Sequence, residues 1–177
     1  MAFLLIFIGI LGRTVFHFGD NIEFVTSSTL LAGSFLGVFW ALFVPLIIMA
    51  ISDLIIGNTN IFIFTWSAYF IIGLLALILL RKKKSFLGRI IKAEAVGILS
   101  SIVFFLWTNF GVWALDGFNM YSDNLSGLLD SYVMGIPFFK ANLLSNLLFV
   151  PIFFFLFQLL IDWRLTPSKS PKISAAK

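Results

Sequence analysis

The sequence predicts an all-α, polytopic membrane protein built as a bundle of six transmembrane helices, and three observations lead to this class. Of the 177 residues, 60% are hydrophobic and only 11% are charged, whereas a soluble domain has about 25% charged residues. The mean hydropathy is +1.07. A chain of this length has room for about six spans of ~20 residues. These features exclude a soluble enzyme, a soluble nucleic-acid-binding domain and a disordered chain.

The first apolar run begins at Met1 and is interrupted by Gly12 and Arg13. Residues 1–11 alone would form a helix of only ~17 Å, whereas the hydrocarbon core is about 30 Å thick. Extending the helix to Phe18 gives a span of about 18 residues, in which the Arg13 side chain reaches toward the lipid headgroups. Because no basic segment precedes the run and no small-residue cleavage site follows it, we expect a retained helix rather than a signal peptide.

The next apolar stretch has no charged residue between Glu23 and Asp53. As one helix, residues 24–57 would be ~51 Å long and would overshoot the membrane. We therefore expect two antiparallel helices, at 24–38 and 40–57, with a tight turn between them. These are the second and third spans of the predicted bundle.

Three further spans are predicted after a polar turn. The fourth runs from 61 to 80 and stops at a run of four basic residues, and the fifth and sixth are expected at 93–113 and 141–161. Apolar residues in the polar interval between them, 115–140, recur at helical spacing. We therefore expect a structured extracytoplasmic loop there, which is either a lid over the outer mouth of the bundle or a cap that hides helix ends.

The positions of the charged residues orient the spans. Ten of the twelve Lys and Arg residues lie in the loop after the fourth span or in the C-terminal tail, and five of the eight acidic residues fall in the opposite set of loops. Basic loops remain cytoplasmic, so both termini are predicted in the cytoplasm. We expect one membrane domain at 1–163 and a disordered tail at 164–177. The predicted location is the cell membrane, the inner membrane of a bacterium, as a multi-pass protein.

Polar residues at the outer end of the bundle are the candidates for ligand binding. Asp53 is an acid within an apolar span, and such residues are usually functional; the alternative is an interfacial aspartate bonded to backbone or to a neighbouring helix. Asn109 needs hydrogen-bond partners in apolar surroundings, and these are either a ligand or other helices. The predicted substrate-binding residues are Asn21, Glu23, Asp53, Asn109, Trp113 and Tyr121.

The sequence contains no catalytic or metal-binding motif. It has no cysteine and a single histidine, His17, and it lacks a nucleotide-binding Walker motif. Catalysis requires a nucleophile with a base, or a metal cluster. We therefore expect no enzyme, no metal and no cofactor. The basic loop is expected to mark topology and to contact anionic lipids of the bilayer rather than nucleic acid.

Three segments resemble an uncharacterised family of small bacterial integral-membrane proteins. They are Ser52-Asp53-Leu54 with Gly57, the Phe-Phe-x-x-Thr-Asn-Phe-Gly-Val-Trp run at 104–113, and residues 121–128 leading to Pro137-Phe138-Phe139. In size and topology that family is similar to the substrate-binding S components of energy-coupling factor (ECF) transporters. The resemblance implies a protein that binds a vitamin or similar micronutrient from the outside and docks on a coupling module with ATPases. S components dock through small residues of the first helix, for which Gly9 and Gly12 are the candidates.

Two functions from different classes follow. The first is a membrane-embedded, S-component-like subunit that binds a small organic micronutrient, such as a vitamin, for uptake. The second is a non-transporting membrane scaffold or assembly protein, in which the polar side chains only hold helices together. Truncation of Asp53 or Asn109 discriminates between them, because it abolishes ligand binding in the first case and impairs folding in the second.

Overall fold

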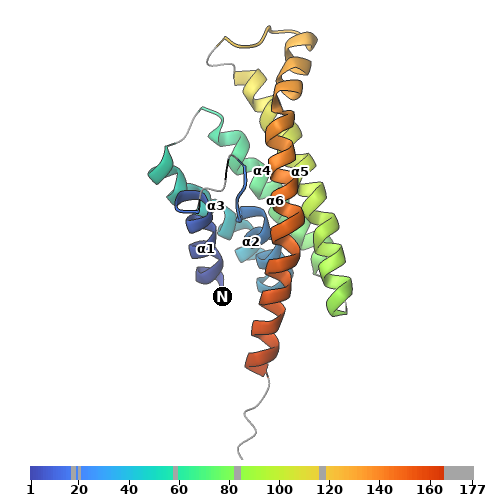
Figure 1. The fold of residues 1–177 in the computed structure, drawn as a ribbon. Coiled ribbons are helices and arrows are strands. Elements are labelled where there is room, and N and C mark those ends of the chain that lie inside the picture. Colours follow the sequence, from blue (N-terminus) through green and yellow to red (C-terminus); the bar gives the residue numbers. More distant parts are fainter. Residues whose placement is uncertain (17–18, 20, 58–59, 82–84, 116–118, 166–177) are drawn as a thin grey trace, which may run out of the picture.

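The computed structural model describes residues 1–16, 19, 21–57, 60–81, 85–115 and 119–165. These residues form helices joined by short connections (Figure 1). The elements in chain order are α1 (Ala2–Thr14), α2 (Val25–Leu31), the π-helical turn η1 (Ala32–Leu36), α3 (Val38–Ile56), α4 (Phe62–Leu80), α5 (Phe86–Leu115) and α6 (Leu125–Leu165). The predicted all-α class is therefore confirmed over the described part of the chain.

Four of these helices are long and apolar enough to cross a membrane, namely α3, α4, α5 and α6. The two apolar helical segments that precede them, α1 and α2–η1, are shorter. The first predicted span was expected to reach Phe18, but α1 ends at Thr14 after 13 residues, and residues 17 and 18 lie outside the described ones. By length and composition, the described residues thus hold four helices able to cross a membrane, whereas the sequence predicted six spans.

The predicted turn between the second and third helices is confirmed at Gly37. This residue separates η1 from α3 and has φ 95° and ψ −174°, a conformation that residues with a Cβ rarely adopt. The helix widens into a π-helical turn immediately before it. The boundaries expected for α2–η1, α3 and α4 agree with the structure to within a single helical turn.

The boundaries expected for the last two spans are wrong. α5 has 30 residues and α6 has 41, so their lengths are ~45 Å and ~62 Å, well beyond the ~30 Å hydrocarbon core. Most of the interval expected as a separate loop structure is the first part of α6, which continues through Pro137. The side chain of Asn124 accepts a hydrogen bond of 3.0 Å from the N–H of Gly127, which caps the start of this helix.

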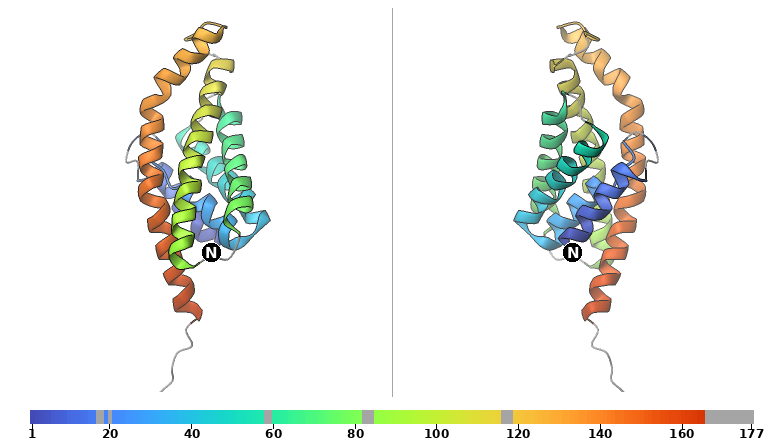
Figure 2. Two further views of the ribbon diagram at one scale, coloured as in Figure 1. Left: turned by 90° about the vertical axis from the view of Figure 1, so that its right-hand side faces the viewer. Right: turned by 90° about the vertical axis from the view of Figure 1, so that its left-hand side faces the viewer.

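α5 and α6 form a long antiparallel hairpin, and the shorter helices pack along one side of it (Figure 2). The start of α1 and the end of α6 both lie in the lower half of Figure 1. The predicted disordered tail, 164–177, falls outside the described residues from position 166 onward.

The close approach of α3 and α4 depends on a proline and a glycine. Pro45 has no N–H, so the carbonyl of Ala41 one turn earlier lacks its usual helical partner. Gly73 of α4 packs directly on that carbonyl, and a Cβ at position 73 would overlap its oxygen. Small residues at such contacts allow membrane helices to associate through close backbone packing.

We predict that Gly73→Ala lowers the free energy of unfolding by about 1–3 kcal/mol, because the added methyl group meets backbone that cannot rotate away. Thermal unfolding of the detergent-solubilised protein measures the change. Gly97→Ala is the matched control in α5, since its Cβ would lie 3.1 Å from a methyl carbon of Val150 and would not overlap a backbone oxygen. Equal losses in the two variants would contradict the importance of the α3–α4 contact.

Candidate functional site

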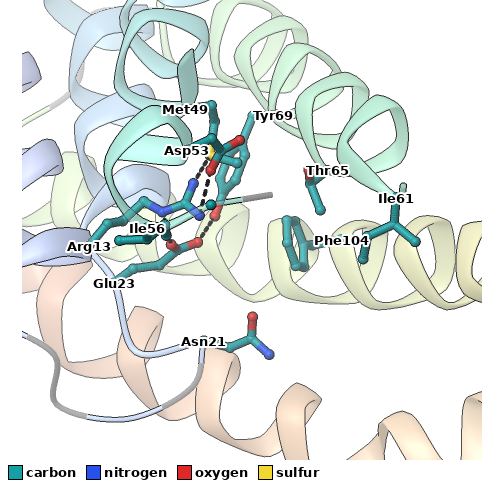
Figure 3. Close-up of a pocket in the computed structure, with 11 residues that line it drawn as sticks. Arg13, Asn21, Glu23, Met49, Asp53, Ile56, Ile61, Thr65, Tyr69 and Phe104 are labelled. Atoms are coloured by element: carbon teal, nitrogen blue, oxygen red, sulfur yellow. Dashed lines mark hydrogen bonds and ion pairs between the residues drawn. The ribbon is translucent and has the colours of Figure 1, made fainter. Parts of the chain in front are cut away.

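A network of charged side chains joins α1 to α3 and to the segment before α2 (Figure 3). Arg13 lies in the last turn of α1. Its Nε atom is 3.3 Å from Oε2 of Glu23, and its Nη2 atom is 3.0 Å from Oδ1 of Asp53. The remaining nitrogen, Nη1, contacts the sulfur atom of Met49. All three guanidinium nitrogens therefore have partners within the bundle.

Two side chains of α4 bind the other oxygen of each carboxylate. Trp66 Nε1 donates a hydrogen bond of 2.7 Å to Oδ2 of Asp53, and the Tyr69 hydroxyl donates to Oε1 of Glu23. The two donors are three residues apart, which places them on one face of the helix. Each carboxylate oxygen thus has a partner, as buried charged groups require.

The network is mostly shielded from solvent. The side chains of Arg13, Glu23 and Asp53 expose 14%, 12% and 7% of their surface. The expectation that Arg13 reaches toward the lipid headgroups is therefore wrong. Two carboxylates inside the bundle offer Arg13 a stronger electrostatic partner than the headgroup region does, and α1 is short enough for its last turn to lie beside them.

Glu23 is held in place by α6. Its backbone N–H donates to Oγ of Ser145 at 3.2 Å, and the same hydroxyl donates to the carbonyl oxygen of Glu23 at 3.1 Å. Two residues earlier, Asn21 has φ 60°, a left-handed conformation that asparagine tolerates better than most residues. Residues 21–23 are therefore fixed by these bonds to α6 and by the backbone conformation of Asn21.

Two adjoining cavities lie beside the network. The first has a volume of about 380 Å³ and is lined by Arg13, Asn21, Glu23, Met49, Asp53, Ile56, Gly57, Ile61, Thr65, Tyr69 and Phe104. The second has a volume of about 400 Å³ and is lined by Asn21, Ile61, Thr65, Phe104, Thr108, Asn109, Val112, Met120, Tyr121, Met134, Gly135 and Phe138. The two share four lining residues, so they form neighbouring parts of one hollow region.

Five of the six predicted binding residues line this region. Glu23 and Asp53 line the first cavity, Asn109 and Tyr121 line the second, and Asn21 lines both. They come from α3, α5 and two connecting segments that are far apart in the sequence. The polar pattern at the outer ends of the predicted spans therefore identified residues that the fold brings together.

The sixth predicted residue, Trp113, lines neither of these two cavities. Its Nε1 atom donates a hydrogen bond of 3.1 Å to the carbonyl oxygen of Ser122, which ties the connection before α6 to the end of α5. Asn109 has a structural contact as well as a cavity position, because its Nδ2 atom donates to the carbonyl oxygen of Phe105 at 2.8 Å.

Several lining or network residues were not identified from the sequence. Arg13 is the only Lys or Arg in the first 80 residues, and a lone cation among apolar helices with acids nearby was a usable signal. Trp66, Tyr69 and Phe104 gave none, because aromatic residues in an apolar helix are equally expected at a membrane interface or in the core.

We predict that Arg13→Met is strongly destabilising, by about 3–5 kcal/mol, because it leaves two buried carboxylates without their cation. Adding Glu23→Gln and Asp53→Asn to this variant removes both unpaired charges, so the triple variant should recover much of the lost stability. Thermal unfolding in one detergent compares the three proteins.

The control for this series is Arg81→Met, which removes a cation from an exposed position after α4 and should leave the unfolding temperature nearly unchanged. If the triple variant were no more stable than Arg13→Met, the loss would come from packing of the arginine side chain rather than from its charge.

No curated protein and no solved structure matches the chain. A family model does match, and it covers residues 1–169, which include all of the described helices, the charged network and both cavities. The expected membership of an uncharacterised family is thereby confirmed. The chain belongs to DUF6580, a family of unknown function.

Proposed function

We propose that this protein is a membrane-embedded subunit that binds a small organic micronutrient, such as a vitamin, for uptake, in the manner of an S component of an ECF transporter. The observation that carries the proposal is the pair of adjoining cavities, of about 380 and 400 Å³. Sites for small organic ligands measure about 300–1,000 Å³ and combine apolar walls with a few polar groups. The lining of both cavities likewise combines apolar side chains with a few polar ones.

The charge distribution supports a cavity that opens to the outside. The cavities are lined by the C-terminal end of α3, the N-terminal part of α4, and the hairpin ends that point upward in Figure 1. The end of α4 and the start of α5, which flank the basic segment in the sequence, lie at the opposite end together with the end of α6. With the basic segments in the cytoplasm, both termini are cytoplasmic and a ligand enters from the other side of the cell membrane.

Uptake would require a partner that supplies energy, because the chain has no nucleotide-binding motif. The small residues expected to dock an ECF coupling module do not lie on the surface. Gly9 packs against Ile48 and Gly12 against Phe24, and both glycines are buried. The exposed side of α1 carries Phe3 instead. A coupling module would therefore dock on a different surface from the one predicted.

The second candidate, a non-transporting scaffold or assembly protein, is favoured by one specific observation. Both carboxylates of the network are bonded to other side chains of the bundle, which is what helix packing alone would require. This reading predicts that Asp53→Ala and Asn109→Ala impair folding without affecting any ligand. Normal stability with lost binding would refute it.

The test is purification with native lipids, followed by mass spectrometry of bound small molecules. We expect a small organic molecule to accompany the wild-type protein and to be absent from Thr65→Trp, because Thr65 lines both cavities and an indole there fills the space that they share.

Leu74→Trp is the matched control. It introduces the same side chain in the same helix at an exposed position, and it should retain the ligand. Loss of the ligand from both variants, or a wild-type protein with no bound molecule and no ATPase partner in pulldowns, would count against the proposed function.

A further inference from the structure

A third, smaller cavity continues the second one into the interface between α5 and α6. Its volume is about 20 Å³, which is room for one water-sized group. Five of its lining residues also line the second cavity, namely Asn21, Phe104, Thr108, Asn109 and Phe138. On the basis of the proposed function, we infer that the ligand is a ring compound with an amide or lactam group, whose carbonyl oxygen enters this small cavity.

Asn142 of α6 brings a hydrogen-bond donor to the small cavity. The residue is only 3% exposed. Its Oδ1 atom accepts a bond of 3.2 Å from Nδ2 of Asn146, which also donates to Oγ of Ser101 at 2.8 Å. These bonds fix the Asn142 amide, and its Nδ2 atom donates to no described residue. Because a buried N–H without an acceptor is costly, an oxygen atom that enters this cavity is stabilised there.

Asn109 of α5 brings a hydrogen-bond acceptor to the same region. Its Nδ2 atom donates to the carbonyl oxygen of Phe105 at 2.8 Å, and its Oδ1 atom accepts from no described residue. The amide lies directly against Gly135 of α6, where a Cβ would overlap Oδ1. Asn109 lines both the small and the second cavity, and Gly135 lines the second. The oxygen is therefore held at the wall where the two cavities meet.

This pair of side chains complements an amide. A carboxamide or lactam has an acceptor oxygen and a donor N–H on neighbouring atoms, so it can bond to Asn142 and Asn109 at once. The remaining walls suit a ring, because four phenylalanines line the small cavity, two from each helix. The rings of Phe105 and Phe139 lie with their centroids 4.9 Å apart, and aromatic rings pack favourably against a further ring.

Two other classes of ligand fit the two asparagines less well. A purely apolar molecule would cover both amides without pairing them, and a buried polar group without a partner lowers affinity. A carboxylate would accept from Asn142, but it has no donor for Oδ1 of Asn109, so two acceptors would face each other.

The experiment compares three probes of nearly one shape: benzamide, acetophenone and benzoate. Acetophenone replaces the amino group of benzamide by a methyl group, and benzoate replaces it by an oxygen that only accepts. Calorimetry on the purified full chain in lipid nanodiscs at about pH 7, where benzoate is ionised, gives the dissociation constants. We expect benzamide to bind about tenfold more tightly than acetophenone, which lacks one hydrogen bond, and benzoate to bind most weakly.

Two substitutions separate the donor from the acceptor. Asn109→Leu removes the acceptor, so it should weaken benzamide about tenfold and leave acetophenone unchanged. Asn142→Leu removes the donor that both carbonyl probes use, so it should weaken both by about the same factor. The control Asn60→Leu makes the same change at an exposed position before α4 and should alter neither.

Gly135→Ala provides a further variant if a leucine variant does not fold, as judged by gel filtration and thermal unfolding. It keeps both asparagines, but the added methyl group displaces the Asn109 amide. It should therefore weaken benzamide and leave acetophenone unchanged.

The outcomes separate this inference from the proposed function. If acetophenone or benzoate bound as tightly as benzamide, or if Asn109→Leu weakened benzamide and acetophenone equally, the amide inference would be overturned and the binding function would stand. A molecule without an amide or lactam group on the purified wild-type protein would have the same meaning. Failure of every probe to bind, together with a wild-type protein that carries no small molecule, would overturn both.

Discussion

The ion pairs of Arg13 are the interaction on which one end of the bundle depends. A guanidinium within apolar helices must be paired, and here its two carboxylate partners come from different parts of the chain, Glu23 and Asp53. Side chains of α4 donate hydrogen bonds to the remaining carboxylate oxygens of Asp53 and Glu23. Ser145 of α6 accepts a hydrogen bond from the backbone N–H of Glu23. Arg13 therefore connects, directly or through one partner, most of the segments that surround the first cavity.

The charged network joins the helices and also lines the first cavity. A structural role and a binding role therefore need not exclude each other. Every carboxylate oxygen of the network has a partner within the protein, and these bonds hold the walls of the cavity in place. A ligand would therefore enter a cavity whose walls are already fixed.

The sequence predicted some parts of this arrangement well. The ends of α3 and α4 were located because Gly37, Gly57 and a basic run interrupt the apolar pattern there. The ends of α5 and α6 were not located correctly, because charged residues do not mark them. Arg89 and Lys140 lie within these helices, which are longer than the bilayer is thick. Polarity indicated the site residues, whereas the partnership of Arg13 with Asp53 depends on tertiary packing between positions 40 residues apart and has no local signal.

The difference in helix length also places the site. α3 and α4, with 19 residues each, are ~28 Å long and match the hydrocarbon core, whereas α5 and α6 extend beyond it. The charged cavity adjoins the ends of the short helices, and the second cavity lies along the extended hairpin that includes Asn109 and Met134. Charges cost less at this boundary than at the bilayer centre, yet they act strongly because little water screens them. In the proposed orientation, a ligand from the outside would meet the second cavity first and then the charged one, near the ends of α3 and α4.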